Sequence, residues 1–163
     1  MGPSEGMSKP AMTFEEVRAA LKQRFPMIMV DTVTSIEPGK SIRTVKNVTG
    51  NEIQFLGHFP EHAVMAGTMI VEAVGQSASI LFSKTTGAGV QPGDFLVLGV
   101  INEMRFLAPV FPGNRLDMEI QVLKFIGDFA LVEAVATVDG TVVAQGKLGF
   151  AKRGLASSEG KGQ

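Results

Sequence analysis

The longest apolar stretch of the chain runs from Met69 to Phe82 and has the pattern of a buried helix. Nearly every position on its helical wheel is apolar or small, which is typical of a helix enclosed on all sides. Glu72 is its single carboxylate, and Gln76 lies one turn later on the same face. Burying an unpaired carboxylate is costly, so we expect Glu72 to be paired, protonated or directed into a ligand cavity.

The C-terminal part of the chain alternates apolar and polar residues with the period of two that is typical of strands. The residues expected to share one buried face are Leu116, Met118, Ile120, Val122, Ala130, Val132, Ala134, Ala136, Val138, Val142, Ala144 and Leu148. Gly127-Asp128 and Asp139-Gly140 have the composition of two-residue hairpin turns. The pattern therefore predicts an antiparallel sheet, reached after a Gly- and Pro-containing loop at 86–93.

The N-terminal third begins with a helix signal. Thr13-Phe14-Glu15-Glu16 is a capping box, flanked by the apolar pair Met12 and Val17, and the helical pattern continues toward Phe25-Pro26. Two strands are predicted next, at 27–36 and 41–48, joined by a type II turn at Pro38-Gly39.

One apolar helix and one long antiparallel sheet predict an α+β fold in which the sheet curls around the helix. At 163 residues the chain is expected to form a single domain, with bounds at 13–153. Residues 1–12 and 154–163 are aperiodic and rich in small and polar residues, so we expect two disordered tails.

Composition excludes several classes of function. The chain has no cysteine, which rules out disulfides, thiolate nucleophiles and cysteine-bound metal, and favours the reducing cytoplasm. No apolar run reaches the roughly 18 residues of a membrane span. A net charge of −1 gives no indication of nucleic-acid binding.

The candidate chemistry combines one histidine with the carboxylate of the buried helix. His58 lies in Gly57-His58-Phe59-Pro60, a loop upstream of that helix. An imidazole with a reference pKa of about 6.5, beside a carboxyl whose pKa burial raises, would supply a base and an acid near neutral pH. His62 forms an H-x-x-x-H pattern with His58, but Pro60 interrupts any helix there, so no metal site is expected.

These motifs resemble the FabZ-type β-hydroxyacyl-acyl-carrier-protein dehydratases. The matching elements are Gly57-His58-Phe59-Pro60, Met65-Ala66-Gly67, Glu72-Ala73, Gln76, Arg24-Phe25-Pro26, Lys46-Asn47-Val48-Thr49 and Arg105-Phe106 with Pro109-Val110. The resemblance covers residues from Phe25 to Phe150. The chain departs from the family at Gln23 (usually His), at 61–63 (usually Gly-Arg-Pro) and at Ala66 (usually Pro). These departures lie where the pocket is expected and favour a specialised acyl or polyketide substrate.

The resemblance implies a hotdog fold and the dehydration of 3-hydroxyacyl thioesters, held on acyl carrier protein, to trans-2-enoyl thioesters. It implies that His58 is the base, that Glu72 is the acid, and that the backbone N–H of Gly67 binds the thioester carbonyl, with Gln76 and Phe59 in support. A glutamate at the acid position, where isomerising relatives carry aspartate, indicates a dehydratase that does not isomerise. No cofactor is expected, because the elimination leaves the overall oxidation state unchanged.

Further residues are weaker candidates. Met65, Met69 and Met104 could line an acyl pocket or simply fill the core. Arg105, Lys124, Lys152 and Arg153 could dock an acidic carrier protein or be ordinary surface charges. We expect a homodimer that pairs sheet edges and brings His58 of one subunit to Glu72 of the other, with a trimer of dimers as a further option.

Two other functions stay open at this point. A hotdog thioesterase would use a helix carboxylate to attack or activate water, and a silent acyl-thioester-binding module would need no catalytic pair. The preserved His58 and Glu72 favour the dehydratase.

Overall fold

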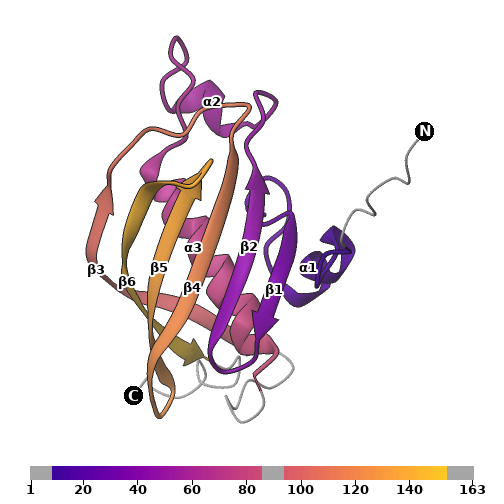
Figure 1. Ribbon diagram of the computed structural model, residues 1–163, viewed down its shortest axis with the longest axis vertical. Helices are drawn as coiled ribbons and strands as arrows, with labels where there is room; N and C mark the ends of the chain where they lie inside the picture. Colours follow the sequence, from indigo (N-terminus) through magenta and orange to yellow (C-terminus); the bar gives the residue numbers. More distant parts are fainter. Residues whose placement is uncertain (1–8, 86–93, 154–163) are drawn as a thin grey trace, which may run out of the picture.

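The computed structural model describes residues 9–85 and 94–153, in which one sheet wraps around one long helix (Figure 1). The helices are α1 (Phe14–Ala20), α2 (Gln54–Gly57) and α3 (Gly67–Ser83). The strands are β1 (Thr32–Glu37), β2 (Ser41–Asn47), β3 (Phe95–Phe106), β4 (Arg115–Ile126), β5 (Phe129–Val138) and β6 (Thr141–Arg153). They form a six-stranded antiparallel sheet in the order β1-β2-β4-β5-β6-β3. The expected hotdog architecture is confirmed.

The predicted buried faces of the central strands meet α3. In β4 and β5 the side chains of Leu116, Met118, Ile120, Ala130, Val132, Ala134 and Ala136 are buried, whereas Val122 and Val138 are half-buried near the strand ends. In β6 the simple alternation fails, because the pairing with β5 shifts register after Ala136 and both Val143 and Ala144 become buried. Period two therefore predicts β4 and β5 well and β6 only in part.

The three predicted turns are confirmed. Lys40 N–H donates to Glu37 O at 3.0 Å around Pro38-Gly39, where Gly39 has a φ of 77°. Two-residue connections join β4 to β5 and β5 to β6. In the second of these, Asp139 and Gly140 both have positive φ, at 48° and 78°, as a type I′ turn requires.

The N-terminal segment differs from its predicted bounds. The capping box forms, with Thr13 N–H donating to Glu16 Oε2 at 2.7 Å, and this hydrogen bond lowers the pKa of Glu16. The helix ends at Ala20, short of Phe25-Pro26. Met12, placed by the sequence at the end of a disordered tail, is buried and forms a β-bridge with Val33. The rest of the expected N-terminal tail, apart from 9–11, and all of the C-terminal tail lie outside the described residues.

The predicted strand at 27–36 begins only at Thr32. Residues 27 and 29 instead have their backbone groups bound by a side chain of α3: Gln76 accepts from Met29 N–H at 2.7 Å and donates to Met27 O at 2.6 Å. An apolar run such as this one can be buried without pairing to another strand, and periodicity does not distinguish the two cases.

Strand β3 was not predicted as an element. It lies at the sheet edge beside β6, and most of its residues are exposed, including Phe95, Val97, Leu98, Val100, Ile101 and Phe106. Apolar residues occupy both of its faces, so no alternation marks it in the sequence. Such a long apolar edge is typical of a surface that another chain covers.

Among the described residues, no helix is both long and apolar enough to cross a membrane.

Candidate active site

His58 follows the last residue of α2, and its imidazole is fixed by a backbone carbonyl. The backbone N–H of His58 donates to Gln54 O at 3.0 Å, and this hydrogen bond closes the short helix. Its Nδ1 lies 2.9 Å from Val64 O. A carbonyl oxygen only accepts hydrogen bonds, so this contact requires a proton on Nδ1. In the neutral imidazole Nε2 then carries the free lone pair, as a general base requires.

The ring of Phe59 supports this orientation. Its centroid lies 4.2 Å from that of the His58 imidazole, with the planes tilted by 44°. The outer side of Phe59 is exposed, as are Leu56 and Ile53 on the same short segment. The segment 53–59, which forms the tip that carries His58, is therefore apolar and exposed in a single chain.

A buried ion pair holds the segment that leads to His58. Lys46 Nζ on β2 lies 3.0 Å from Glu52 Oε2, and only 7% of the Lys46 side chain is exposed. Glu52 also accepts from Thr49 N–H at 2.9 Å and from the Gln54 side chain at 2.6 Å. No sequence pattern assigned Lys46 a role, although it stands in the Lys46-Asn47-Val48-Thr49 element. The ion pair therefore fixes the start of α2 against the sheet.

Glu72 lies in the second turn of α3 and is held by Gln76. Gln76 Nε2 donates to Glu72 Oε1 at 2.8 Å, while the same amide binds the backbone of Met27 and Met29. Gln76 is 1% exposed, and Glu72 is half-buried. The expectation of a fully buried carboxylate is thus wrong for one chain, because its face of α3 remains partly open. Among the described residues Glu72 forms no ion pair, so the ligand-facing interpretation is favoured.

The N-terminus of α3 presents two free donors. Met69 and Ile70 N–H groups donate to Ala66 O, at 2.9 and 3.2 Å. Within the described part of the chain, the N–H groups of Gly67 and Thr68 bind no acceptor. They lie at the positive end of a 17-residue helix, where an oxygen that gains negative charge is stabilised.

His58 and Glu72 are not joined within one chain. Each has its own partner, Val64 O for His58 and Gln76 for Glu72, and no hydrogen bond or ion pair links the two side chains in the described structure. A single chain therefore provides a held base and a held acid without a direct connection between them.

The remaining predicted residues are dispersed. Met65 is buried in the core, and Met69 and Met104 are half-buried against it, which agrees with the core-filling interpretation. Of the four basic candidates, Arg105 lies opposite Gln145 in the register of β3 with β6. The other three, Lys124, Lys152 and Arg153, lie toward the opposite end of the sheet. There Lys152 Nζ is 3.2 Å from Asp128 Oδ1. The four therefore do not form one patch.

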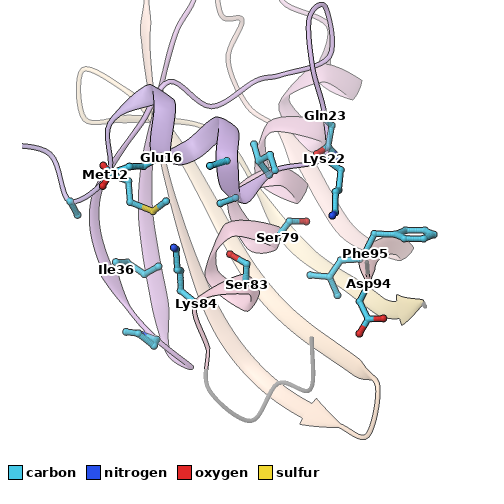
Figure 2. A pocket seen from close by; sticks show the side chains of 16 residues that line it. Met12, Glu16, Lys22, Gln23, Ile36, Ser79, Ser83, Lys84, Asp94 and Phe95 are labelled. Atoms are coloured by element: carbon cyan, nitrogen blue, oxygen red, sulfur yellow. The ribbon is translucent and has the colours of Figure 1, made fainter. Parts of the chain in front are cut away.

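A cavity among the described residues lies away from His58 and Glu72, beside the C-terminal half of α3. It measures about 1080 Å³, is open to solvent on one side, and is lined by residues of α1, α3 and the start of β3. Figure 2 shows Ser79 and Ser83 rising from α3 on one side and Phe95 on the other. Spacings of four, three and four residues place Glu72, Gln76, Ser79 and Ser83 on one face of α3. The cavity is thus further along the face that carries the carboxylate.

Comparison with known proteins agrees with this arrangement. The FabA-like domain model matches residues 21–147. The chain is 42% identical to the 3-hydroxyacyl-acyl-carrier-protein dehydratase FabZ of Dechloromonas aromatica, over 88% of this chain and 100% of that protein. It is 39% identical to the FabZ of Vibrio cholerae, over 89% of this chain and 94% of that one.

Solved structures share the fold at low identity. The dehydratase heterocomplex ApeI:P from Xenorhabdus doucetiae matches with a TM-score of 0.70 at 17% identity, over 86% of this chain and 92% of that one. The fluoroacetyl-CoA thioesterase FlK matches with a TM-score of 0.63 at 15% identity, over 75% and 91%. Both likenesses establish the fold alone.

A sheet wrapped around α3, with a histidine on the preceding loop and a glutamate on the helix, defines a hotdog-fold protein of the dehydratase type. The chain belongs to the FabA-like family, and its resemblance to the FabZ dehydratases is confirmed.

Proposed function

We propose that this protein dehydrates 3-hydroxyacyl thioesters, carried on acyl carrier protein, to trans-2-enoyl thioesters. The observation that carries the proposal is the contact between His58 Nδ1 and Val64 O, because it leaves Nε2 as a free base in Gly57-His58-Phe59-Pro60, the motif that resembles the FabZ family. The names of those relatives support the substrate class.

In this mechanism the thioester carbonyl accepts hydrogen bonds from the free N–H groups of Gly67 and Thr68. Stabilising negative charge on that oxygen acidifies the α-carbon. His58 Nε2 removes the α-proton, and the electron pair forms the new carbon–carbon double bond. Glu72, in its protonated form, gives its proton to the departing β-hydroxyl, which leaves as water. The proton then held by His58 returns to Glu72, directly or through solvent, before the next turnover.

The acid must point in one direction throughout this sequence, and Gln76 supplies that constraint. Its amide is fully occupied by Met27 O, Met29 N–H and Glu72 Oε1, so it cannot rotate without breaking backbone hydrogen bonds. Within the described residues Glu72 Oε2 has no protein partner, so it is the oxygen available to the substrate.

The complete site is proposed to form between two copies of the chain. Three observations support this: the lack of a hydrogen bond or ion pair between His58 and Glu72 in the described structure, the exposed apolar edge of β3, and the exposed apolar residues around α2. Phe25 is 81% exposed beside Met27, next to the Gln76–Glu72 pair, and it offers an apolar surface to the partner's tip. The proposed unit is a homodimer with two shared sites, and assembly of three dimers is a further step.

The acyl tail is proposed to run along α3 into the cavity lined by Ser79 and Ser83. This cavity continues along the face of α3 that carries Glu72, and it has the volume that a ligand of drug size requires. Among the basic candidates, Arg105 alone lies at the Phe106 end of β3, so it is the residue proposed to meet the carrier protein. The cysteine-free sequence supports a cytoplasmic location.

The test is turnover of 3-hydroxyacyl thioesters of graded length, followed by the absorbance of the conjugated enoyl product, with free thiol measured in parallel. Appearance of enoyl thioester without thiol release is expected. Release of thiol without enoyl product would indicate a thioesterase, and tight binding without either product would indicate a binding module.

A further inference from the structure

Phe106 lies directly against Gly67 at the start of α3. A Cβ placed on Gly67 would be 2.9 Å from Phe106 Cε1 and 3.0 Å from Cζ, closer than side chains pack. The ring therefore occupies the space of a side chain at position 67, beside the two free N–H groups. Half of Phe106 remains exposed, so its outer face is open to a ligand or a partner.

A bulge in β3 gives Phe106 this direction. Ile101 pairs with Leu148 and Phe106 pairs with Ala144, and both β6 partners are buried beneath the sheet. Residues five apart on a regular strand point to opposite faces, so one extra residue must lie between them. It lies between Asn102 and Arg105, where the register shifts.

Two local features preserve the bulge. Glu103 has a φ of 54°, which is unfavourable for a residue with a side chain. Gly146 faces the bulge from β6, and a Cβ there would fall 2.7 Å from Met104 Cα. The fold thus maintains a strained backbone whose result is the inward orientation of Phe106.

We infer that Phe106 is a specificity-determining residue: its ring closes the space beside the thioester carbonyl and selects acyl groups without a substituent on the α-carbon. The inference rests on the proposed function, because it uses Gly67 N–H as the donor to that carbonyl. Besides its oxygen, the carbonyl carbon is bonded to sulfur and to the α-carbon. The sulfur bears the same carrier arm in every substrate. The Phe106 ring beside the carbonyl therefore distinguishes substrates by the groups on their α-carbon.

The activity test compares 3-hydroxybutyryl with 2-methyl-3-hydroxybutyryl thioesters on wild type, Phe106→Leu and Phe106→Ala. The kcat/KM ratio of branched to unbranched substrate should rise at least about tenfold in Phe106→Ala, the scale of one methyl group in a tight pocket. The ratio should rise less in Phe106→Leu, which also guards against misfolding of the alanine variant. An unchanged ratio in active variants overturns the inference alone. Failure of the wild type to dehydrate the unbranched substrate overturns the proposed function, and the inference with it.

A stability cycle tests the contact without any activity. Gly67→Ala should lower the midpoint of thermal unfolding, and adding Phe106→Ala to it should lower the midpoint by less than Phe106→Ala does in wild type. Strict additivity would show that the ring does not exclude a side chain at Gly67.

Discussion

Gln76 donates a hydrogen bond of 2.8 Å to Glu72, one turn away on α3, while its amide also binds the backbone of the segment at 27–29. One buried side chain therefore connects the proposed acid to the loop that covers it. The carboxylate is oriented by a neutral amide, so its position does not depend on an ion pair among the described residues.

This relationship predicts different outcomes for the two residues. Gln76→Leu should destabilise the protein by about 2–4 kcal/mol, because it leaves Met29 N–H buried without a partner and also removes the hydrogen bond to Met27 O, and it should also lower kcat. Glu72→Gln should abolish dehydration while changing stability by less than about 1 kcal/mol, since its amide can still accept from Gln76 and no ion pair is lost. Urea unfolding and turnover of one substrate measure both. Marked destabilisation by Glu72→Gln would indicate a structural carboxylate.

His58→Ala is expected to lower kcat by about two to four orders of magnitude, the usual loss for one positioned base. The fold should persist, because the backbone hydrogen bond from residue 58 to Gln54 O does not need the imidazole. His62→Ala is the matched control: His62 is exposed and touches the ring edge of Phe111. Near wild-type turnover by His58→Ala, checked by circular dichroism, would refute the assignment of the base.

Lys46→Met should destabilise the protein by about 2–4 kcal/mol, because it leaves Glu52 unpaired in a mostly buried position. Turnover should fall as well, since the ion pair and hydrogen bonds of Glu52 hold the start of α2. The control is Lys40→Met, which breaks the fully exposed pair with Glu37 and should leave stability nearly unchanged. Equal effects of the two variants in chemical denaturation would argue against a role for the buried pair.

Mixing the inactive variants His58→Ala and Glu72→Gln tests the shared site. After mild dissociation and reassociation, a mixed dimer would contain one intact site, and a fraction of the wild-type rate should return. Subunit exchange must be shown in parallel with differently tagged chains. Exchange without recovery, or an active wild-type monomer in sedimentation, would exclude the shared-site arrangement.

Ser79→Phe should shorten the range of acyl chains that the enzyme accepts, because the ring would project into the cavity beside α3. kcat/KM should fall for long chains and change little for a four-carbon substrate. Ser79→Ala, which removes only the hydroxyl group, should keep the wild-type length profile. A parallel loss for all chain lengths would mean that the acyl tail lies elsewhere.

The sequence by itself determined the central part of the fold. The all-apolar pattern of α3 requires that other elements enclose it, and the period-two pattern of β4 and β5 indicates which face does so. Turn composition set the hairpins, since Asp139 and Gly140 suit the positive φ that the turn requires. The motifs by themselves also single out His58, Glu72 and Gln76.

Only the tertiary structure decided the rest. Strand β3 has apolar residues on both faces, so no alternation distinguishes it, and only the strand order shows that it lies at the edge of the sheet. The Gln76 contacts with Met27 and Met29, the Lys46–Glu52 pair, and the packing of Phe106 on Gly67 join segments far apart in the chain. Local periodicity reports how many faces of an element are buried. It does not report which distant residue lies opposite, because that depends on strand register and on bulges such as the one at Glu103.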